Sequence, residues 1–424
     1  MNILIISAGK FLSSYGGGQV YVRRLVDEFM KRDELQISIL DFSHQDERDS
    51  IEETFYRGGS IYSVSSNVDD AFLSSLLKII RPDIVHIHGH KSQMSRVCRT
   101  MNIPCVVTAH HGGIVCPAGA LLNSKDKICY VQINYRDCLK CCLHNIRFGN
   151  FLYPVLRLIP ESTYISLGEL LKKLPFIYYI TPVGTAALSI KCKKKEWKTI
   201  CANCSKMIAP SHAIQQAMEQ NGMPSEKLIV IPHGVPQPNI PPSFPAIKNQ
   251  RIKFFYVGRI SYIKGIHILL EAFHRVTAPH AELHLIGGAG TQREKSYMEH
   301  LKKKYDSDSR ILWHGKLNEA QINAAISQYH ILIHPTISME VFGLNIAEAL
   351  TMGKWVLSTQ CGGAEMQIIE GKNGWLVSPN NIAALKNIIE GILLFPPCSS
   401  PSVFYEQSIE KHVTDLLDTF KKLI

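Results

Sequence analysis

The chain has 424 residues, 46% hydrophobic and 19% charged, a balance typical of a globular protein and a length too great for one hydrophobic core. No run of eighteen apolar residues occurs, which argues against a transmembrane helix, and the apolar start MNILIISAGK lacks the basic region and cleavage site of a signal peptide. The formal net charge of +10 favours an anionic partner, such as a phosphate or an anionic membrane surface; because no nucleic-acid motif accompanies it, we expect no nucleic acid.

The first half of the chain has the strand and helix pattern of a parallel α/β domain. Its aliphatic first strand is followed by Gly16, Gly17 and Gly18, and then by the apolar periodicity of a helix over 19–31. Glycines between a strand and a helix let the phosphates of a ligand approach the backbone, and a flexible turn is the alternative. The predicted strands of this half are 2–7, 36–42, 82–90, 105–110, the start of 206–212, and 227–231.

Histidines stand near the ends of two of these strands. His86 and His88 alternate with aliphatic residues, and hydrogen-bonded structural histidines at a strand end are the simpler interpretation. His110 and His111 end the next strand, before two glycines.

An irregular, cysteine-rich insertion over 116–204 interrupts the pattern and contains eight of the twelve cysteines. Cys138 and Cys141 have the C-x2-C spacing that zinc sites use for two thiolates, and a second such pair ends the insertion. Without an export signal, the cysteines are expected as thiols or metal ligands in a cytoplasmic protein. A structural zinc or iron and plain thiols both remain open, and no neighbouring base suggests a catalytic thiol.

The middle of the insertion interleaves apolar and basic residues. Prolines divide it, so we expect that it does not span a membrane. Two interpretations stay open: a segment lying on an anionic membrane surface, or helices packed in the domain with solvated lysines. The apolar residues are Phe148, Phe151, Leu152, Tyr153, Phe176, Tyr178 and Tyr179. The basic cluster is Lys191, Lys193, Lys194 and Lys195.

Composition also predicts the domain boundaries. Residues 236–245 are dense in proline and lack periodicity, as expected of a linker. We therefore expect an N-terminal domain over 1–238, a linker over 239–250 and a C-terminal domain over 251–400, with a final helix in 401–424.

In the second half, two cations follow a predicted strand over 251–258. Arg259 and Lys264 stand at the carboxyl end of this strand and before a helix. Because ligands of open α/β sheets bind outside the carboxyl ends of strands, the two are placed to neutralise a diphosphate. Two solvated loop cations are the alternative.

The stretch from His334 to Gly374 organises the second half. A buried strand stops at His334 and Pro335, Glu340 falls in a loop, and Gly343 opens a helix that contains Glu348. The free amides of such a helix start can bind a phosphate, and a carboxylate inside the first turns can reach a ribose diol. An ordinary strand–loop–helix unit with solvated glutamates is the alternative.

The residues of this stretch, in their order, resemble the retaining glycosyltransferases of family 4 with their E-x7-E signature. The order is Glu340, Phe342, Gly343, Glu348, Gly353, Gly362, Gly363, Glu365, Asn373 and Gly374. The glycine loop, the Thr-x-His segment ending at His110 and the G-R-x4-K-G pattern of Arg259 and Lys264 extend the resemblance over most of the chain. The family often has aspartate where this chain has His111, so the role of that position is open.

The resemblance implies an α/β GT-B fold, with two doubly wound Rossmann-like domains facing across a cleft and a C-terminal helix, in 401–424, that crosses back to the N-terminal domain. It implies retaining transfer of a sugar from a nucleotide diphosphate sugar to an acceptor hydroxyl. It further implies catalytic roles for His110, Glu340, Arg259 and Lys264, with Glu340 holding the sugar. The donor would contact Gly17, Gly18, Arg259, Lys264, Phe342, Gly343, Leu344 and Glu348, the last at the ribose. A subset of the family has a similar cysteine loop, which favours Cys116, Cys129, Cys138 and Cys141 as the metal ligands.

Because cations and helix amides can balance the leaving diphosphate, we expect catalysis without a metal or other cofactor. The acceptor is expected to be a saccharide or a lipid-linked saccharide of polysaccharide or glycolipid synthesis, such as lipopolysaccharide or capsule, reached from the cytoplasmic face of a membrane. A sugar-nucleotide epimerase on the same fold and a non-catalytic binding protein are the alternatives; the E-x7-E pair with Arg259 and Lys264 favours transfer.

Overall fold

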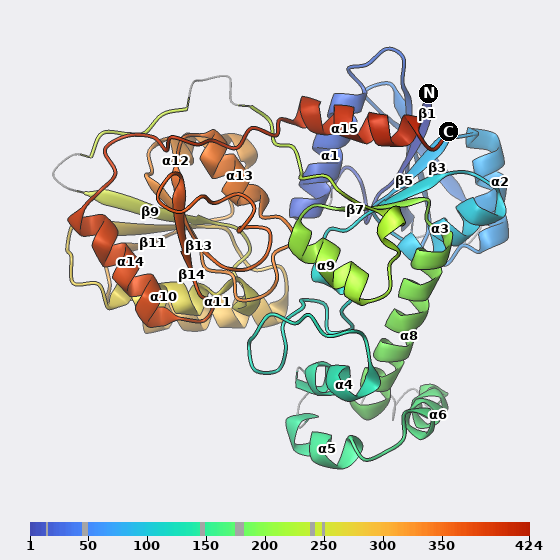
Figure 1. Ribbon diagram of the computed structural model, residues 1–424, viewed down its shortest axis with the longest axis horizontal. Helices are drawn as coiled ribbons and strands as arrows, with labels where there is room; N and C mark the ends of the chain where they lie inside the picture. The colour runs from blue at the N-terminus through green and yellow to red at the C-terminus, as the bar shows by residue number, and fades with distance from the viewer. Residues whose placement is uncertain (14–15, 45–49, 145–148, 174–181, 238–241, 248–250) are drawn as a thin grey trace. The chain divides into compact units, whose positions relative to one another are not determined.

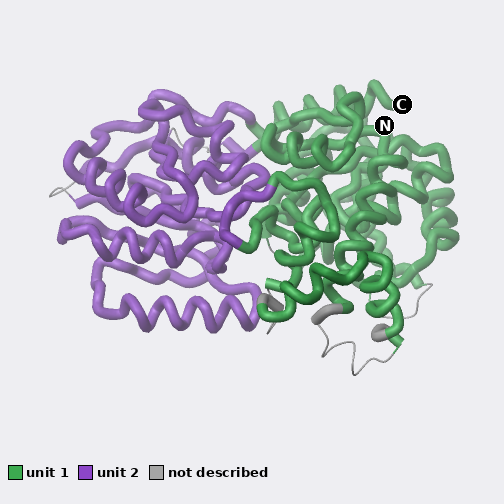
Figure 2. Tube along the Cα trace, turned by 60° about the horizontal axis from the view of Figure 1, so that its bottom comes forward, with its two compact units in different colours: residues 1–124, 130–234, 408–424 green, residues 125–129, 235–407 purple. Residues whose placement is uncertain are grey.

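The computed structural model describes residues 1–13, 16–44, 50–144, 149–173, 182–237, 242–247 and 251–424. The chain divides into two compact units, coloured separately in Figure 2. Unit 1 comprises Met1–Ser124, Tyr130–Gly234 and Ser408–Ile424. Unit 2 comprises Lys125–Cys129 and Val235–Gln407.

Unit 1 is built on an eight-stranded sheet with the order β3-β4-β2-β1-β5-β6-β7-β8. All neighbouring strands are parallel except β3 and β4, which form an antiparallel hairpin at the edge. The strands are β1 (Asn2–Ile6), β2 (Gln36–His44), β3 (Ile51–Tyr56), β4 (Gly59–Ser65), β5 (Ile84–Ile87), β6 (Cys105–Thr108), β7 (Lys206–Ala209) and β8 (Leu228–Val230).

Helices cover this sheet and are capped where the sequence supplies a cap. The side chains of Asp69, Ser211 and Ser408 accept amide hydrogen bonds at the starts of α2, α9 and α15, which satisfies part of the first turn. The helices around the sheet are α1 (Gly17–Phe29), α2 (Asp70–Ile80), α3 (Lys91–Thr100), α9 (His212–Gln220) and α15 (Ile409–Lys421). α15 buries its apolar face within unit 1, beside α1.

The cysteine-rich insertion folds as helices with a small core of their own. It contains α4 (Tyr135–His144), α5 (Gly149–Leu156), α6 (Glu161–Lys172) and the long α8 (Pro182–Asn203), which in Figure 1 runs from the sheet of unit 1 to the three shorter helices. Leu139, Leu143, Tyr164 and Ile190 are buried between them. Pro154 lies inside α5 instead of ending it, and Phe148, Phe176, Tyr178 and Tyr179 lie outside the described residues.

Unit 2 is built on a six-stranded sheet, all parallel, with the order β11-β10-β9-β12-β13-β14. The strands are β9 (Ile252–Val257), β10 (Ala281–Ile286), β11 (Ile311–Gly315), β12 (Ile331–His334), β13 (Trp355–Thr359) and β14 (Gly374–Val377). The helices are α10 (Ile266–His274), α11 (Gln292–Lys304), α12 (Glu319–Ser327), α13 (Leu344–Thr351) and α14 (Ile382–Leu394).

Two parallel, helix-covered sheets confirm the predicted pair of doubly wound α/β domains. The aliphatic strands β5, β6 and β12 are buried throughout their length, as their continuous apolar runs indicate. The helix predicted over 19–31 begins two residues earlier, at Gly17. Within the described residues, no helix combines the length and the apolar character needed to cross a bilayer.

Candidate functional site

In unit 2, the loop after β9 carries both predicted cations. Lys264 ends a short 3-10 turn (Tyr262–Lys264), and Gly265 follows in the left-handed region at φ 68°. A methyl group at Gly265 would overlap the carbonyl oxygen of Pro335, so only glycine lets this loop pass directly over the end of β12. The close approach places Lys264 at the carboxyl end of two adjacent strands.

Glu340 is the carboxylate that receives Lys264. The Lys264 amine forms an ion pair with Glu340 Oε2, and His334 Nε2 lies 3.3 Å from the same oxygen. The backbone of Glu340 is fixed as well, because its N–H donates to Cys361 O at 2.7 Å and its carbonyl accepts from Gly363 N at 2.8 Å. The Glu340 side chain stays 18% exposed, and that of Lys264 23%.

The charge of Glu340 is stabilised by its partners. Burial by itself raises the pKa of a carboxylate, but the positive charge of Lys264 and hydrogen bonds from His334 and Lys264 lower the pKa of Glu340 far below its usual range. Glu340 is therefore ionised at every pH at which the protein would function, and it can accept hydrogen bonds from hydroxyl groups.

Arg259 lies in the same loop but has a different partner. Its guanidinium Nη1 is 3.4 Å from Glu294 Oε1, and its side chain is 51% exposed. Tyr256 is buried beneath the loop, and its hydroxyl donates to Arg259 O at 2.8 Å. The structure thus brings Lys264 and Glu340 together, whereas Arg259 is held next to the start of α11.

The helix after Glu340 begins without a side-chain cap. Gly343 occupies the N-cap position of α13 at φ 90° and, as a glycine, makes no side-chain capping bond. Leu344 is half-buried. The amides of this turn remain directed along the positive end of the helix dipole, as an anion site requires.

Phe342, predicted to contact the donor, is buried among Val235, Ala347 and Tyr405. Its carbonyl accepts from Gln367 Nε2 at 2.6 Å, and a methyl group at Gly363 would overlap its backbone. Its side chain and its carbonyl therefore both fix the loop. Glu348, half-buried, lies in the second turn of α13.

In unit 1, His110 lies beside the glycine start of α1. A side chain at Gly18 would contact the His110 ring, with Cβ–Cβ at 3.5 Å. His110 Nε2 is hydrogen-bonded to His88 Nδ1 at 2.8 Å, and the Tyr21 ring lies 5.4 Å away. The structure therefore brings the predicted Gly18 and His110 together, while Gly17 is exposed at the first residue of α1.

Buried aromatic and imidazole rings, linked by hydrogen bonds, pack around His110 on the side of the core. His412 Nδ1 lies 2.7 Å from Pro232 O and must donate to it, because a carbonyl oxygen can only accept. The other ring nitrogen, Nε2, therefore carries no proton and accepts from the Tyr21 hydroxyl at 2.8 Å. His86 Nε2 bonds Thr108 Oγ1 at 2.8 Å. His86 and His88 are thus buried and hydrogen-bonded, as predicted.

These histidines are neutral. Burial lowers the pKa of His110 well below its usual range, and the charge of Lys91 lowers it further. Burial likewise lowers the pKa of His412 to about 4 and that of His111 to about 4. A neutral His110 can donate or accept one hydrogen bond, but it cannot supply a positive charge near neutral pH.

Three of the four predicted metal ligands lie near one another. The thiols of Cys138, Cys116 and Cys141 are close enough to Cys142 to help burial raise its pKa to about 12. Across the part of the chain that the structure describes, no three His, Cys, Asp or Glu side chains are arranged as metal ligands. Cys129, the fourth predicted ligand, belongs to unit 2, whereas the other three belong to unit 1. The metal site stays a prediction.

Several residues that hold the predicted site residues in place could not be recognised from the sequence pattern. His334 bonds Thr336 Oγ1 at 2.9 Å and Asn345 Nδ2 at 3.2 Å, and it thereby orients its ring toward Glu340. Tyr21 and His412 are 391 residues apart in the sequence. The strand-end position of His334 was the only local signal, because the other partners are set by tertiary contacts.

Comparison with known proteins finds a separate family match in each half of the chain. The profile described as "Glycosyltransferase Family 4" matches residues 15–129, and the one described as "Glycosyl transferases group 1" matches residues 242–411. The phosphatidylinositol N-acetylglucosaminyltransferase gpi3 subunit of Schizosaccharomyces pombe is 25% identical over 167 residues, 39% of this chain and 36% of that protein. A lipopolysaccharide 1,2-N-acetylglucosaminetransferase of Salmonella typhimurium is 26% identical over 206 residues, 45% and 54% respectively. The chain thus spans about a third to a half of the length of these relatives.

Among solved structures, Anabaena Alr3699/HepE in complex with UDP and glucose is similar over nearly the whole chain. The TM-score is 0.61 at 16% identity, covering 99% of this chain and 96% of the other. At this identity the likeness concerns the fold, and it agrees with the two doubly wound units described above.

Proposed function

Because the chain belongs to the group 1 and family 4 glycosyltransferases and has their GT-B fold, we propose that it transfers a sugar, with retention, from a nucleotide diphosphate sugar to a hydroxyl of a saccharide acceptor. The observation that carries the proposal is the Lys264–Glu340 ion pair next to the uncapped, glycine-initiated α13. Cation, carboxylate and free helix amides are the groups that a diphosphate and a sugar require in one place.

In the proposed reaction, the bond between the anomeric carbon and the diphosphate oxygen breaks, and its electron pair leaves with the diphosphate. The acceptor hydroxyl bonds to the anomeric carbon from the same face and passes its proton to the departing diphosphate oxygen. Lys264, Arg259 and the first amides of α13 stabilise the developing diphosphate charge. Glu340, held ionised, accepts hydrogen bonds from the sugar hydroxyls, and Glu348 binds the ribose. These residues balance the charge without a metal.

The test combines a donor screen with two variants. Thermal shift with nucleoside diphosphates identifies the base, because binding to the folded state raises the melting temperature. Lys264→Ala and Arg259→Ala should then each reduce transfer by about a hundredfold while the fold is kept. Folded variants with near wild-type turnover would contradict the assignment. Release of a labelled epimer without acceptor would favour an epimerase instead.

The acceptor is proposed to be lipid-linked, in polysaccharide or glycolipid synthesis at the cytoplasmic face of a membrane. Support comes from α5, the turn that follows it and α6, where several apolar side chains are exposed. Phe151 is 82% exposed and Leu158 77%, and Val155, Leu167 and Leu170 are exposed too. Leu152 and Tyr153 pack instead against the insertion core.

The lysine cluster contributes less than its charge suggests. Lys191, Lys193 and Lys194 form ion pairs with Glu169, Glu196 and Glu161 respectively. Each unpaired lysine near an anionic bilayer contributes about 1 kcal/mol, so most of the proposed binding falls to the apolar residues of α5.

Vesicle sedimentation tests the membrane proposal. Wild-type protein should bind anionic vesicles more than neutral ones, and Phe151→Ser with Leu158→Ser should reduce that binding by about tenfold or more. Leu394→Ser, at an exposed leucine of unit 2, is the matched control. Equal partition to both vesicle types would make a soluble acceptor the better assignment.

A structural zinc or iron held by Cys116, Cys129, Cys138 and Cys141 is proposed on their spacing and on the gathering of three of these thiols. Elemental analysis of protein purified without added metal should find a near-stoichiometric ion. Metal-free protein with an unchanged melting temperature would leave plain thiols.

A further inference from the structure

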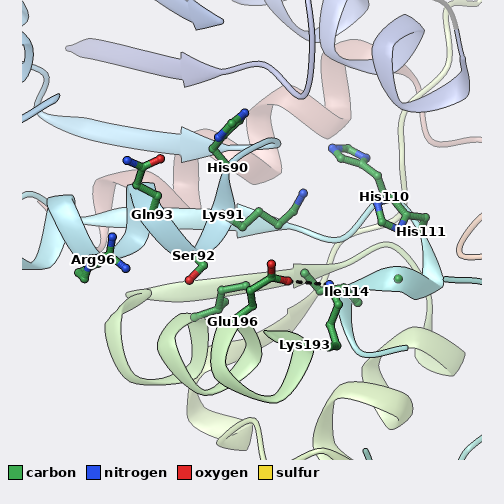
Figure 3. Close-up of a pocket in the computed structure, with 12 residues that line it drawn as sticks. His90, Lys91, Ser92, Gln93, Arg96, His110, His111, Ile114, Lys193 and Glu196 are labelled. Atoms are coloured by element: carbon green, nitrogen blue, oxygen red, sulfur yellow. Dashed lines mark hydrogen bonds and ion pairs between the residues drawn. The ribbon is translucent and has the colours of Figure 1, made fainter. Parts of the chain in front are cut away.

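A cavity of about 500 Å³ lies within unit 1, beside His110. Figure 3 shows Lys91 extending from the start of α3 toward His110 and His111, with Lys193 and Glu196 of α8 below. Its volume is in the range of small-ligand sites and large enough for a phosphorylated monosaccharide. None of the side chains that give the cavity its charge is part of the donor machinery described above.

Lys91 is the cation that lacks a balancing carboxylate. Arg96, also in the lining, forms a bidentate pair with Asp70 at 2.5 and 2.8 Å, and Lys193 pairs with Glu196 at 2.8 Å. The Lys91 amine instead donates to the carbonyl oxygen of His88, and no carboxylate of the described residues neutralises it. A sequestered ammonium group is costly unless an anion accompanies it.

The start of α3 adds donors to the same wall. His90, in the left-handed region at φ 45°, occupies the N-cap position, and its side chain makes no capping bond; it stacks on Phe42 instead. The amides of Lys91, Ser92 and Gln93 thus meet the cavity at the positive end of a ten-residue helix. Cavity, uncompensated ammonium and free amides together have the chemistry of a phosphate site.

We propose that this cavity binds a phosphate group carried by the acceptor saccharide, with Lys91 and the first turn of α3 as its ligands. The proposal rests on the proposed glycosyl transfer, because it makes the cavity the acceptor's anchor next to His110. A sugar phosphate in solution and a phosphate that joins a saccharide to a lipid share this chemistry.

Calorimetry with the donor site filled by a saturating nucleoside diphosphate tests the proposal. Glucose 6-phosphate is one probe, with glucose as its uncharged control, and a polyprenyl phosphate in detergent micelles is the other, with the same micelles alone as control. Binding of either phosphate probe, but not of its control, is expected. The tighter probe identifies the source of the phosphate.

Lys91→Met should weaken that binding tenfold or more, whereas Lys91→Arg should retain most of it. Lys78→Met, which removes an exposed lysine from α2, is the matched control and should bind as the wild type does. Circular dichroism and donor binding show that the variants are folded.

No binding of either phosphate probe, or equal binding to Lys91→Met, would overturn the proposal. The proposed transfer fails separately, if nucleoside diphosphates do not bind or the Lys264 variant keeps its activity.

Discussion

At the residue scale, two carboxylates eight positions apart are expected to have different partners. Glu340 is ion-paired with Lys264 and fixed by backbone hydrogen bonds on both sides, whereas Glu348 lies on a regular helical turn of α13. We therefore expect Glu340 to hold one geometry at the sugar and Glu348 to meet the ribose diol.

Conservative variants separate these roles. Glu348→Gln should weaken binding of the free nucleoside diphosphate by about tenfold, the value of one charged hydrogen bond. Glu340→Gln should leave that binding within about twofold and lower turnover with the sugar donor, because its partner is the sugar. Calorimetry with the diphosphate and steady-state rates measure the two effects; the opposite pattern would reverse the assignment.

Lys91 predicts a pH dependence of phosphate binding. Burial, with the charge of Lys193, lowers the pKa of Lys91 to about 8, so the free protein loses this charge as the pH rises through about 8. Around the amine, His90, His110 and His111 are neutral because burial lowers each pKa, Lys193 is paired with Glu196, and Arg96 is paired with Asp70. Affinity for glucose 6-phosphate should therefore fall from pH 7 to pH 9.5. In Lys91→Arg, which keeps its charge, calorimetry should find the affinity nearly constant.

At the element scale, the β9–α10 loop is shaped by glycines that let backbone segments touch. Gly265 passes over Pro335, and a side chain at Gly287 would overlap the carbonyl of Gly258. Arg259 and Lys264 have long, flexible side chains. We therefore expect the close backbone contacts at Gly265 and Gly287 to contribute more to the position of these cations than their side-chain ion pairs do.

A pair of glycine variants tests this. Gly265→Ala adds both left-handed strain and overlap with Pro335, and it should cut transfer by about a hundredfold as Lys264 is displaced. Gly315→Ala, at φ 71° but with open space around it, carries only the strain, of about 1 kcal/mol or slightly more. Melting temperature and turnover, measured side by side, separate strain from displacement; equal losses in the two variants would show that overlap is unimportant.

At the scale of the whole molecule, the two groups of predicted site residues belong to separate compact units. His110 and the glycine start lie in unit 1, and Arg259, Lys264, Glu340 and Glu348 lie in unit 2. The last helix, although it follows unit 2 in the sequence, completes unit 1, where His412 bonds Tyr21.

Ending the chain at Gln407 should therefore unfold unit 1. The segment removed buries Ile409, Val413, Leu416, Leu417 and Phe420. At about 1.5–3 kcal/mol for each side chain, the loss is comparable to the entire stability of a domain, about 5–15 kcal/mol. Calorimetric unfolding should show one transition lost, whereas a chain ending at Lys421 keeps both. Two intact transitions in the shorter chain would contradict this role of α15.

The sequence by itself determined the fold class and most of its elements, and it predicted the donor residues, because both rest on local patterns. Apolar runs predicted the buried strands, and glycine and proline marked where they stop. The order of Glu340, Gly343 and Glu348 carried the resemblance, and the fold class it implied is confirmed. The amphipathic helix in 401–424 could likewise be expected from its apolar spacing.

Only the tertiary structure decided which distant side chains meet. Lys264 and Glu340 are 76 positions apart, and Tyr21 and His412 are 391. The side chain of Phe342, which the resemblance places at the donor, is buried with Val235 and Ala347, because burial depends on which elements pack around a residue. Lys91 is distinguished from the other lysines only in the folded chain, where it lines a cavity with α8 and its amine has no carboxylate partner among the described residues. Contacts between such distant residues depend on how whole helices and strands pack, so they cannot be predicted from periodicity or local spacing.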